Sequence, residues 1–173
     1  AADAKGLRTA AIHEDDPVAL FISPVLARRP GQVPEGTVAT PLGKGVVRRE
    51  GTDVTVVAVG VTVPLALETA EALDADGISV EVWEPVSLLP LDRAGLVASV
   101  EKTGRLVVCD DAPRTCGFAA EVASLAADRC FAALKAPVKR VSRADVTTPF
   151  GTSIEPVTQP NRAQLEATIR VIL

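Results

Sequence analysis

The chain has 173 residues, of which 47% are hydrophobic and 23% are charged, a balance typical of globular domains. This length suits one domain of ordinary size with a small appendage, and such a domain buries a core without help from disulfides. The formal net charge of −4 argues against a nucleic-acid surface, which needs clustered positive charge. It leaves room for a small anionic ligand, which needs only a local site.

Composition also bears on where the protein works. No apolar run approaches the roughly 20 residues that a membrane helix needs, and the N-terminal stretch AADAKGLRTA lacks the apolar core of a secretory signal. The cysteines Cys109, Cys116 and Cys130 are odd in number and lack zinc-like spacing, so we expect no metal site. They suit a reducing compartment, the bacterial cytoplasm or the mitochondrial matrix. The absence of methionine indicates a chain that is processed, split or cut from a longer polypeptide.

The first part of the chain is expected to form short elements and then a connector. Residues 3 to 13 predict a helix that Asp3 can cap, and the apolar run from Val18 to Ile22 predicts a buried strand. Residues 24 to 45 are rich in proline and glycine, which break helices and central strands. We therefore place a domain boundary near residue 35, which divides the chain into residues 1–35 and 36–173.

Beyond this boundary, short apolar strands alternate with amphipathic helices. Continuous apolar runs are typical of parallel strands that are buried on both faces. The alternation, with right-handed crossovers, predicts an α/β fold of three α/β/α layers around a mainly parallel sheet. The expected strands are an edge strand at residues 45–49 and then residues 54–59, 79–83, 106–109 and 138–141.

Each expected helix begins at a capping residue and carries an apolar stripe. The predicted caps are Thr62, Asp92, Thr115 and Asn161, the last of which forms a capping box with Gln164. The residues predicted to face the core are Val63, Ala66, Ala70 and Leu73, then Leu96 and Val100, then Phe118, Val122 and Leu125, and finally Leu165, Ile169 and Ile172.

The segment CDDAPRTCGFAAE, residues 109 to 121, is the most distinctive motif. Arg114 and the free backbone N–H groups of Thr115, Cys116 and Gly117 at a helix N-terminus make a candidate anion site. The simpler interpretation, which the residues favour, is that Thr115 caps the helix and Arg114 pairs with one of the preceding aspartates. The anion site stays open because ligands of open α/β sheets bind beyond the strands' carboxyl ends.

No catalytic or cofactor-binding residue is assigned. Cys116 lies near a helix N-terminus beside Arg114, which lowers a thiol pKa, but a nucleophile also needs a base. The only histidine, His13, lies across the domain boundary and is expected at a helix end on the surface. The turn at Gly60 lacks the further glycines of a dinucleotide site.

Several strings together resemble one family. These are DAKGL, DDPVALF, PEGTVATPLGKGVVRREGTDVTVVAVG, the stretch from LVVCDDAPRT to APVKRV, and the closing TTPFGTSIEPVTQPN. In this order they resemble the beta subunits of thiamine-diphosphate-dependent 2-oxo acid dehydrogenases, which include the pyruvate, branched-chain and acetoin enzymes. The resemblance spans essentially the whole chain.

The resemblance implies the transketolase C-terminal fold, a five-stranded sheet whose first strand is antiparallel to the others. Residues 1–35 would be the tail of a preceding pyrimidine-binding domain plus a linker, and residues 36–173 the transketolase C-terminal-like domain. The family's glutamate that activates the thiamine aminopyrimidine is missing. Thiamine diphosphate and magnesium would therefore belong to the assembled enzyme, and we expect neither to bind to this chain alone, which we expect to be inactive.

The resemblance also implies an assembly role. The partners would be the alpha subunit, a second beta subunit and the lipoyl-bearing acyltransferase component, with no nucleic acid or membrane involved. The candidate contact residues are Pro149, Phe150, Ile169 of the last helix, and Leu173.

Some positions depart from the family pattern. Ile22 and Ser23 stand where an acidic and then a basic residue are common, and Cys116-Gly117 replaces a common Gly-Gly. Such changes are compatible with a divergent paralogue or a split-subunit enzyme that acts on a different substrate. The alternatives are therefore part of a split transketolase-type enzyme, or a non-catalytic binding module on the same fold.

Overall fold

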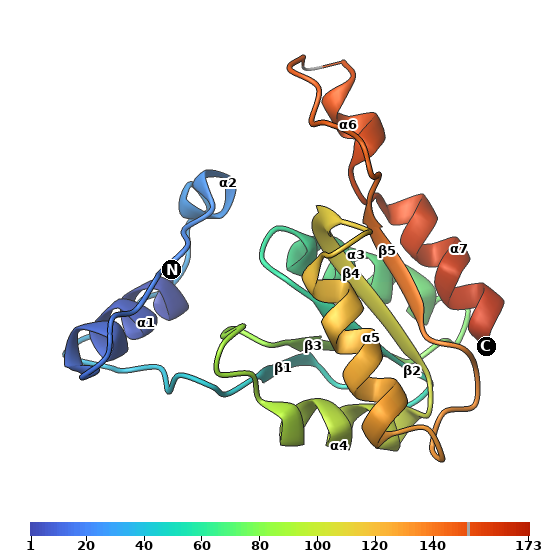
Figure 1. The fold of residues 1–173 in the computed structure, drawn as a ribbon, viewed down its shortest axis with the longest axis horizontal. Helices are drawn as coiled ribbons and strands as arrows, with labels where there is room; N and C mark the ends of the chain where they lie inside the picture. The colour runs from blue at the N-terminus through green and yellow to red at the C-terminus, as the bar shows by residue number, and fades with distance from the viewer. Residues whose placement is uncertain (152) are drawn as a thin grey trace.

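The computed structural model describes every residue except Thr152 and contains one five-stranded sheet in the order β1-β3-β2-β4-β5. Strand β1 runs antiparallel to β3, and the other neighbours are parallel, as predicted. Figure 1 shows helices on both faces of the sheet, so the predicted three-layer fold is confirmed. The strands are β1 Val46–Arg49, β2 Val54–Ala58, β3 Val80–Glu84, β4 Leu106–Pro113 and β5 Lys139–Arg143.

The helices divide into layers that bury separate cores. Helices α3 and α7 cover one face of the sheet, and α4 and α5 cover the other (Figure 1). No described helix is long and apolar enough to cross a membrane. The helices are α1 Ala2–His13, α2 Pro24–Ala27, α3 Thr62–Asp74, α4 Arg93–Thr103, α5 Phe118–Arg129, α6 Glu155–Thr158 and α7 Arg162–Ile172.

The central strands feed both cores at once. Side chains alternate along a strand, so Val54 and Val56 of β2 pack under α3 and α7, whereas Val57 packs under α4 and α5. The predicted helical stripes are confirmed: all their residues are buried except Phe118, which packs half-buried against the second core. A glycine also serves this packing, because a Cβ at Gly45 would lie 2.1 Å from the ring of Trp83.

The predicted caps have mixed outcomes. Asp92 accepts the N–H of Gly95 at 3.0 Å, and the Asn161–Gln164 capping box is present, so both predictions are confirmed. Burial opposes the ionised form of Asp92, but the hydrogen bonds from the N–H groups of Gly95 and Gly45 together outweigh this effect, so the pKa of Asp92 is lowered. Thr62 is not a cap. It lies inside α3, where its hydroxyl reaches the carbonyl oxygen of Cys109 at 2.7 Å.

The predicted strand from Val18 to Ile22 is wrong. These residues form no strand and are exposed, with Phe21 at 91% exposure, because no other strand of the chain pairs with them. The predicted helix is present as α1, but Asp3 does not cap it. Its carboxylate instead pairs with Arg48 at 2.7 Å, which ties α1 to the edge of the sheet.

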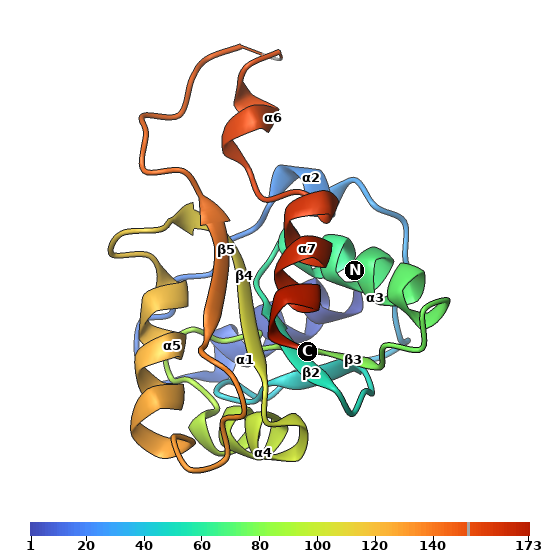
Figure 2. The ribbon, with the colours of Figure 1, turned by 90° about the vertical axis from the view of Figure 1, so that its right-hand side faces the viewer.

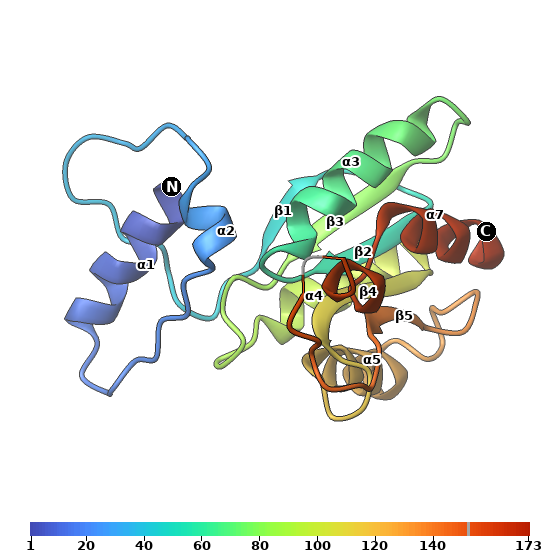
Figure 3. The same cartoon turned by 90° about the horizontal axis from the view of Figure 1, so that it is seen from above.

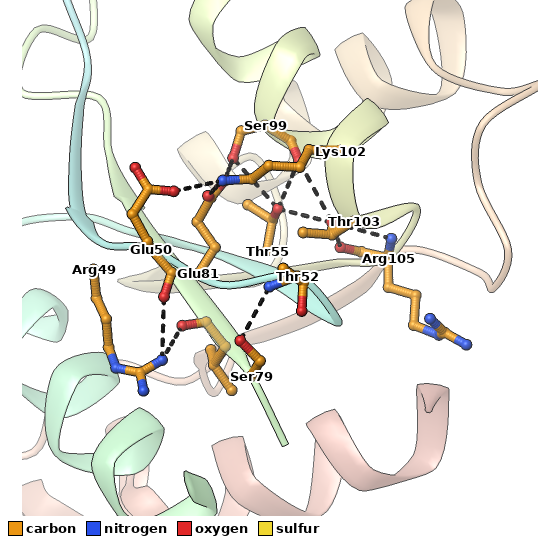
Figure 4. A network of polar contacts seen from close by, with 11 residues as sticks. Arg49, Glu50, Thr52, Thr55, Ser79, Glu81, Ser99, Lys102, Thr103 and Arg105 are labelled. Carbon is orange, nitrogen blue, oxygen red and sulfur yellow. Dashed lines mark hydrogen bonds and ion pairs between the residues drawn. The ribbon is translucent and has the colours of Figure 1, made fainter. Parts of the chain in front are cut away.

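A buried polar cluster fastens α4 to the sheet at the amino-terminal ends of its parallel strands (Figure 4). The side chain of Glu81 on β3 is fully buried, accepts the hydroxyl of Ser99 and pairs with Lys102. Thr55 on β2 donates to the carbonyl oxygen of Ser99 at 2.9 Å and lies 2.9 Å from the hydroxyl of Thr103. Because buried charges are tolerated only when they are paired, Lys102 is what allows a glutamate in this strand.

Replacing Leu96 with aspartate tests the inward face of α4. Leu96 is fully buried, so an unpaired carboxylate there should lower the free energy of unfolding by roughly 3–5 kcal/mol. Ala98→Asp, on the exposed face of the same helix, is the matched control and should change little. Chemical denaturation measures both, and equal effects of the two substitutions would show that the helix face is misassigned.

Lys102→Met tests the buried pair. The substitution leaves the buried carboxylate of Glu81 without its partner and should lower the free energy of unfolding by about 2–4 kcal/mol. This loss is smaller than the loss expected for a fully buried ion pair, because Lys102 is partly exposed. Adding Glu81→Gln should recover more than half of that loss. Glu50→Gln removes the exposed partner of Lys102 and should cost at most about 1 kcal/mol. A double variant as unstable as the sum of its single changes would rule out the pairing.

Candidate functional site

The distinctive motif lies at the carboxyl end of β4, where α5 begins. β4 extends further than predicted because Asp110, which is almost fully buried, pairs in register with Ser142 of β5. The Asp110 carboxylate accepts the N–H groups of Ala112 at 3.1 Å and Ala119 at 3.2 Å. Asp110 thus accepts a hydrogen bond from an N–H group of the first turn of α5, which is the capping role that the sequence predicted for Thr115.

Thr115 does not cap α5, which begins only at Phe118 after Gly117. Its N–H and its hydroxyl donate to Asp145 at 2.8 and 2.7 Å. These hydrogen bonds lower the pKa of Asp145, a residue of the loop after β5. A carboxylate of the chain itself thus occupies two donors of the predicted anion site.

The other members of the predicted anion site are placed as follows. Arg114 pairs with neither Asp110 nor Asp111, contrary to the simpler interpretation, and instead donates to the carbonyl oxygen of Arg140 at 3.0 Å. Cys116 is exposed with a φ of +59°, and a Cβ at Gly117 would lie 2.1 Å from the carbonyl oxygen of Pro113. The loop therefore turns sharply, in a way that requires glycine at position 117.

The cysteines other than Cys116 belong to the core, as predicted. Burial raises the pKa of the Cys109 thiol to about 12, so it stays protonated near neutral pH. Burial also raises the pKa of Cys130. His13 is exposed at the end of α1, as expected. Among the described residues no group of three or more histidine, cysteine, aspartate or glutamate side chains is arranged to hold a metal ion.

An open cavity of about 360 Å³ lies between the loop after β3 and the start of α5. Its lining is mixed: leucine side chains and Phe118 supply apolar surface, and Arg93 and Glu121 add one charge of each sign. Leu89 in this loop is 92% exposed. This surface was not predicted from the sequence, although the consecutive residues Leu88 and Leu89 are a visible signal of it. The lining residues are Leu88, Leu89, Pro90, Leu91, Arg93, Phe118 and Glu121.

The predicted contact residues fall into different settings. Phe150 is fully exposed and Pro149 half-buried, on the segment between β5 and α7 that projects from the body in Figure 2. Leu173 is also exposed, and Arg105 holds the chain end through the carbonyl oxygens of residues 172 and 173. Ile169, by contrast, belongs to the inward stripe of α7 and is fully buried within this chain. Other exposed apolar residues of the projecting segment are Val146, Ile154 and Val157.

The N-terminal segment lies to one side of the sheet (Figure 3). Within residues 1–40 only Gly6 is buried, which leaves α1 without a buried side chain. The Asp3–Arg48 pair joins the segment to β1, and within the segment the N–H of Thr40 donates to the carbonyl oxygen of Gly6 at 3.1 Å.

Both arginines of β1 form ion pairs with carboxylates of the chain. Arg48 bridges Asp3 and Glu84, and Arg49 donates two bonds to the Asp74 carboxylate at 2.5 and 2.6 Å. Burial raises the pKa of Glu84, and its pairing with Arg48 opposes that rise. Sequence alone could not reveal these partners, which are distant along the chain.

Comparisons with known proteins match residues 43–165 to the family described as "Transketolase, C-terminal domain". The chain is 44% identical over 153 residues to the acetoin:2,6-dichlorophenolindophenol oxidoreductase subunit beta of Bacillus subtilis, covering 88% of this chain and 45% of that protein. It is 41% identical over 172 residues to the pyruvate dehydrogenase E1 component subunit beta of the same organism, covering 99% and 53%. The chain thus spans about half the length of these curated relatives.

Solved structures agree on the fold. A split gene transketolase, described as an inactive beta4 tetramer, superposes with a TM-score of 0.69 at 31% identity, covering 83% of this chain and 45% of that one. A transketolase mutant from Pichia stipitis superposes with a TM-score of 0.51 at 14% identity, covering 80% and 20%, a likeness of fold alone.

The family match covers the whole sheet and helices α3 to α6, and the two beta subunits named above match 88% and 99% of this chain. The chain therefore belongs to the transketolase C-terminal domain family, and it is similar in sequence to beta subunits of 2-oxo acid dehydrogenases.

Proposed function

We propose that this chain serves as the C-terminal assembly domain of the beta subunit of a thiamine-diphosphate-dependent 2-oxo acid dehydrogenase. The whole enzyme would oxidatively decarboxylate a 2-oxo acid and pass the acyl group to lipoamide. This chain would supply contact surfaces to the alpha subunit, a second beta subunit and the acyltransferase component. The observation that carries the proposal is the pairing of a densely packed body with apolar side chains left exposed on its projecting segments.

The division at residue 35 fits this proposal. Residues 36–173 include the whole sheet with its two cores, whereas residues 1–35 bury almost nothing of their own. Apolar side chains such as Phe21 and Val25 gain from leaving water only if another surface covers them. We propose that residues 1–35 are the tail of a pyrimidine-binding domain plus a linker, and that the rest of that domain covers them.

Cofactor chemistry is proposed for the assembly and not for this chain. The exposed thiol of Cys116 has no histidine near it, since His13 lies at the far end of α1, and the Cys109 thiol is held protonated. We infer that thiamine diphosphate and magnesium bind where other parts of the enzyme meet. We also propose that the enzyme works in the bacterial cytoplasm or the mitochondrial matrix.

A second candidate is part of a split transketolase-type enzyme, favoured by the 31% identity to the split gene transketolase. Assays of the assembled enzyme separate the candidates. Reduction of an artificial electron acceptor with a 2-oxo acid supports the dehydrogenase, whereas two-carbon transfer between sugar phosphates supports the transketolase. A binding module without an enzyme predicts neither activity and a chain that stays monomeric.

The assembly role predicts that the chain travels with partners. Native mass spectrometry of the protein from its source should show it in one complex with an alpha subunit. Phe150→Glu should weaken that association about tenfold or more, since a fully exposed aromatic is a typical interface anchor. The control is Phe131→Glu, which changes an exposed phenylalanine in the turn that follows α5, outside the projecting segment. A wild-type chain that is always alone and monomeric would refute the assembly role.

The cofactor assignment predicts the result of a calorimetric titration. Thiamine diphosphate with magnesium should give no saturable heat with this chain alone and saturable binding with the assembled enzyme. One-to-one binding by the isolated chain would overturn the assignment, because the site would then lie within these residues.

A further inference from the structure

Strand β5 is an edge of the sheet and carries Lys139, Arg140 and Arg143. The opposite edge, β1, is also basic, but its arginines are paired with carboxylates of the chain. Among the described residues, no ion pair within 4.0 Å includes a basic residue of β5. The positive charge of β1 is thus balanced by ion pairs within the chain, whereas none that the structure describes involves β5. Burial raises the pKa of the Asp111 carboxylate, and the charge of Arg143 opposes that rise only from beyond ion-pair distance.

Arg114, at the end of the motif loop, joins Arg140 in a reciprocal arrangement. The Nη1 of Arg114 donates to the carbonyl oxygen of Arg140 at 3.0 Å, and the Nη1 of Arg140 donates to the carbonyl oxygen of Arg114 at 2.8 Å. The backbone is fixed as well, since the N–H of Arg114 donates to the carbonyl oxygen of Arg143 at 3.1 Å. Both guanidinium groups are therefore held at one corner of the sheet.

These contacts orient the arginines without neutralising them. A carbonyl oxygen carries no net charge, and each guanidinium keeps further N–H donors beyond its Nη1. Asp145 is the carboxylate of this corner: its oxygens accept the N–H and the hydroxyl of Thr115 and lie outside ion-pair distance of the Arg114 guanidinium, whose charge still contributes to lowering the pKa of Asp145. Two neighbouring positive charges repel each other, whereas an anion bound between them is attracted to both.

An unpaired hydroxyl lies on the same strand. The Oγ of Ser142 is buried and has no hydrogen-bond partner among the described residues. Because side chains alternate along a strand, Ser142 shares a face of β5 with Arg140. A buried polar atom without a partner is uncommon in native structures and calls for an explanation at its own location.

We propose that Arg114 and Arg140 bind an oxyanion, the phosphate or carboxylate group of a small ligand. Guanidinium groups suit such groups because their planar N–H donors match pairs of oxygens. The site replaces the one predicted from sequence: Arg114 is kept, Arg140 takes the place of residues 115–117, and Asp145 holds Thr115. This ligand site goes beyond the assembly role and does not depend on it.

Calorimetric titration of the full chain tests the site, with inorganic phosphate and malonate as separate probes in low-salt buffer. At least one probe should bind saturably to the wild type. Arg140→Gln and Arg114→Gln should each weaken that binding about tenfold, the typical effect of losing one charge-assisted pair. Arg129→Gln removes an equal charge from an exposed position on α5, where Arg129 pairs with Asp128, and should leave the affinity within about twofold.

The variants also separate loss of the site from loss of the fold. Arg140→Gln acts in a strand, whereas Arg114→Gln acts in a loop, so thermal melting of both should show that the sheet persists. A preference for phosphate would indicate a phosphate-bearing ligand, and a preference for malonate a carboxylate ligand. Equal affinity in all three variants and the wild type, or no saturable binding of either probe, would overturn the proposal.

Discussion

The structure depends on one constraint: the three central strands are buried on both faces over most of their length, and only the carboxyl ends of β3 and β4 approach solvent. Every residue of β2 is buried, and β2 sends side chains into both cores. A sheet of this kind is stable only when helices cover both of its faces, which is why the chain must alternate strands with crossovers. Glu81 is the instructive exception, because a charge in such a strand needs Ser99 and Lys102 of α4 to complete its environment.

This constraint also decides where function can lie. The interior of the body offers packed side chains and a protonated thiol, and its polar cluster lies at the amino ends of the parallel strands. Ligands of open α/β sheets bind at the opposite, carboxyl edge. The features that remain unsatisfied are found there or beyond it: the cavity beside Leu89, the arginines at the end of β4 and on β5, and the segment that carries Phe150.

Sequence reasoning succeeded where the deciding contacts are local. Asp92 and the Asn161–Gln164 box act on residues within one helical turn, and the apolar stripes follow directly from helical periodicity. It failed where a polar side chain found a partner far along the chain. Asp3, Thr62 and Thr115 each have the chemistry of a cap, but they bind Arg48, the carbonyl oxygen of Cys109, and Asp145 instead. The same limit applies to the Arg114–Arg140 corner, where β4 and β5 are neighbours only in the folded sheet.

The N-terminal segment shows why an apolar pattern does not by itself predict a strand. The run from Val18 to Ile22 has the composition of a core strand, but a strand also needs a partner for its backbone, and none of the strands that the structure describes pairs with it. Helix α1 is in a similar position, because 12 residues without a buried side chain are marginal as an isolated helix in water. The run from Val18 to Ile22 and helix α1 both have sequence patterns typical of buried elements, but their side chains are not buried in this chain. A surface outside these residues is the physical complement that such a pattern requires, which links the exposed segment to the proposed assembly more directly than any single contact residue does.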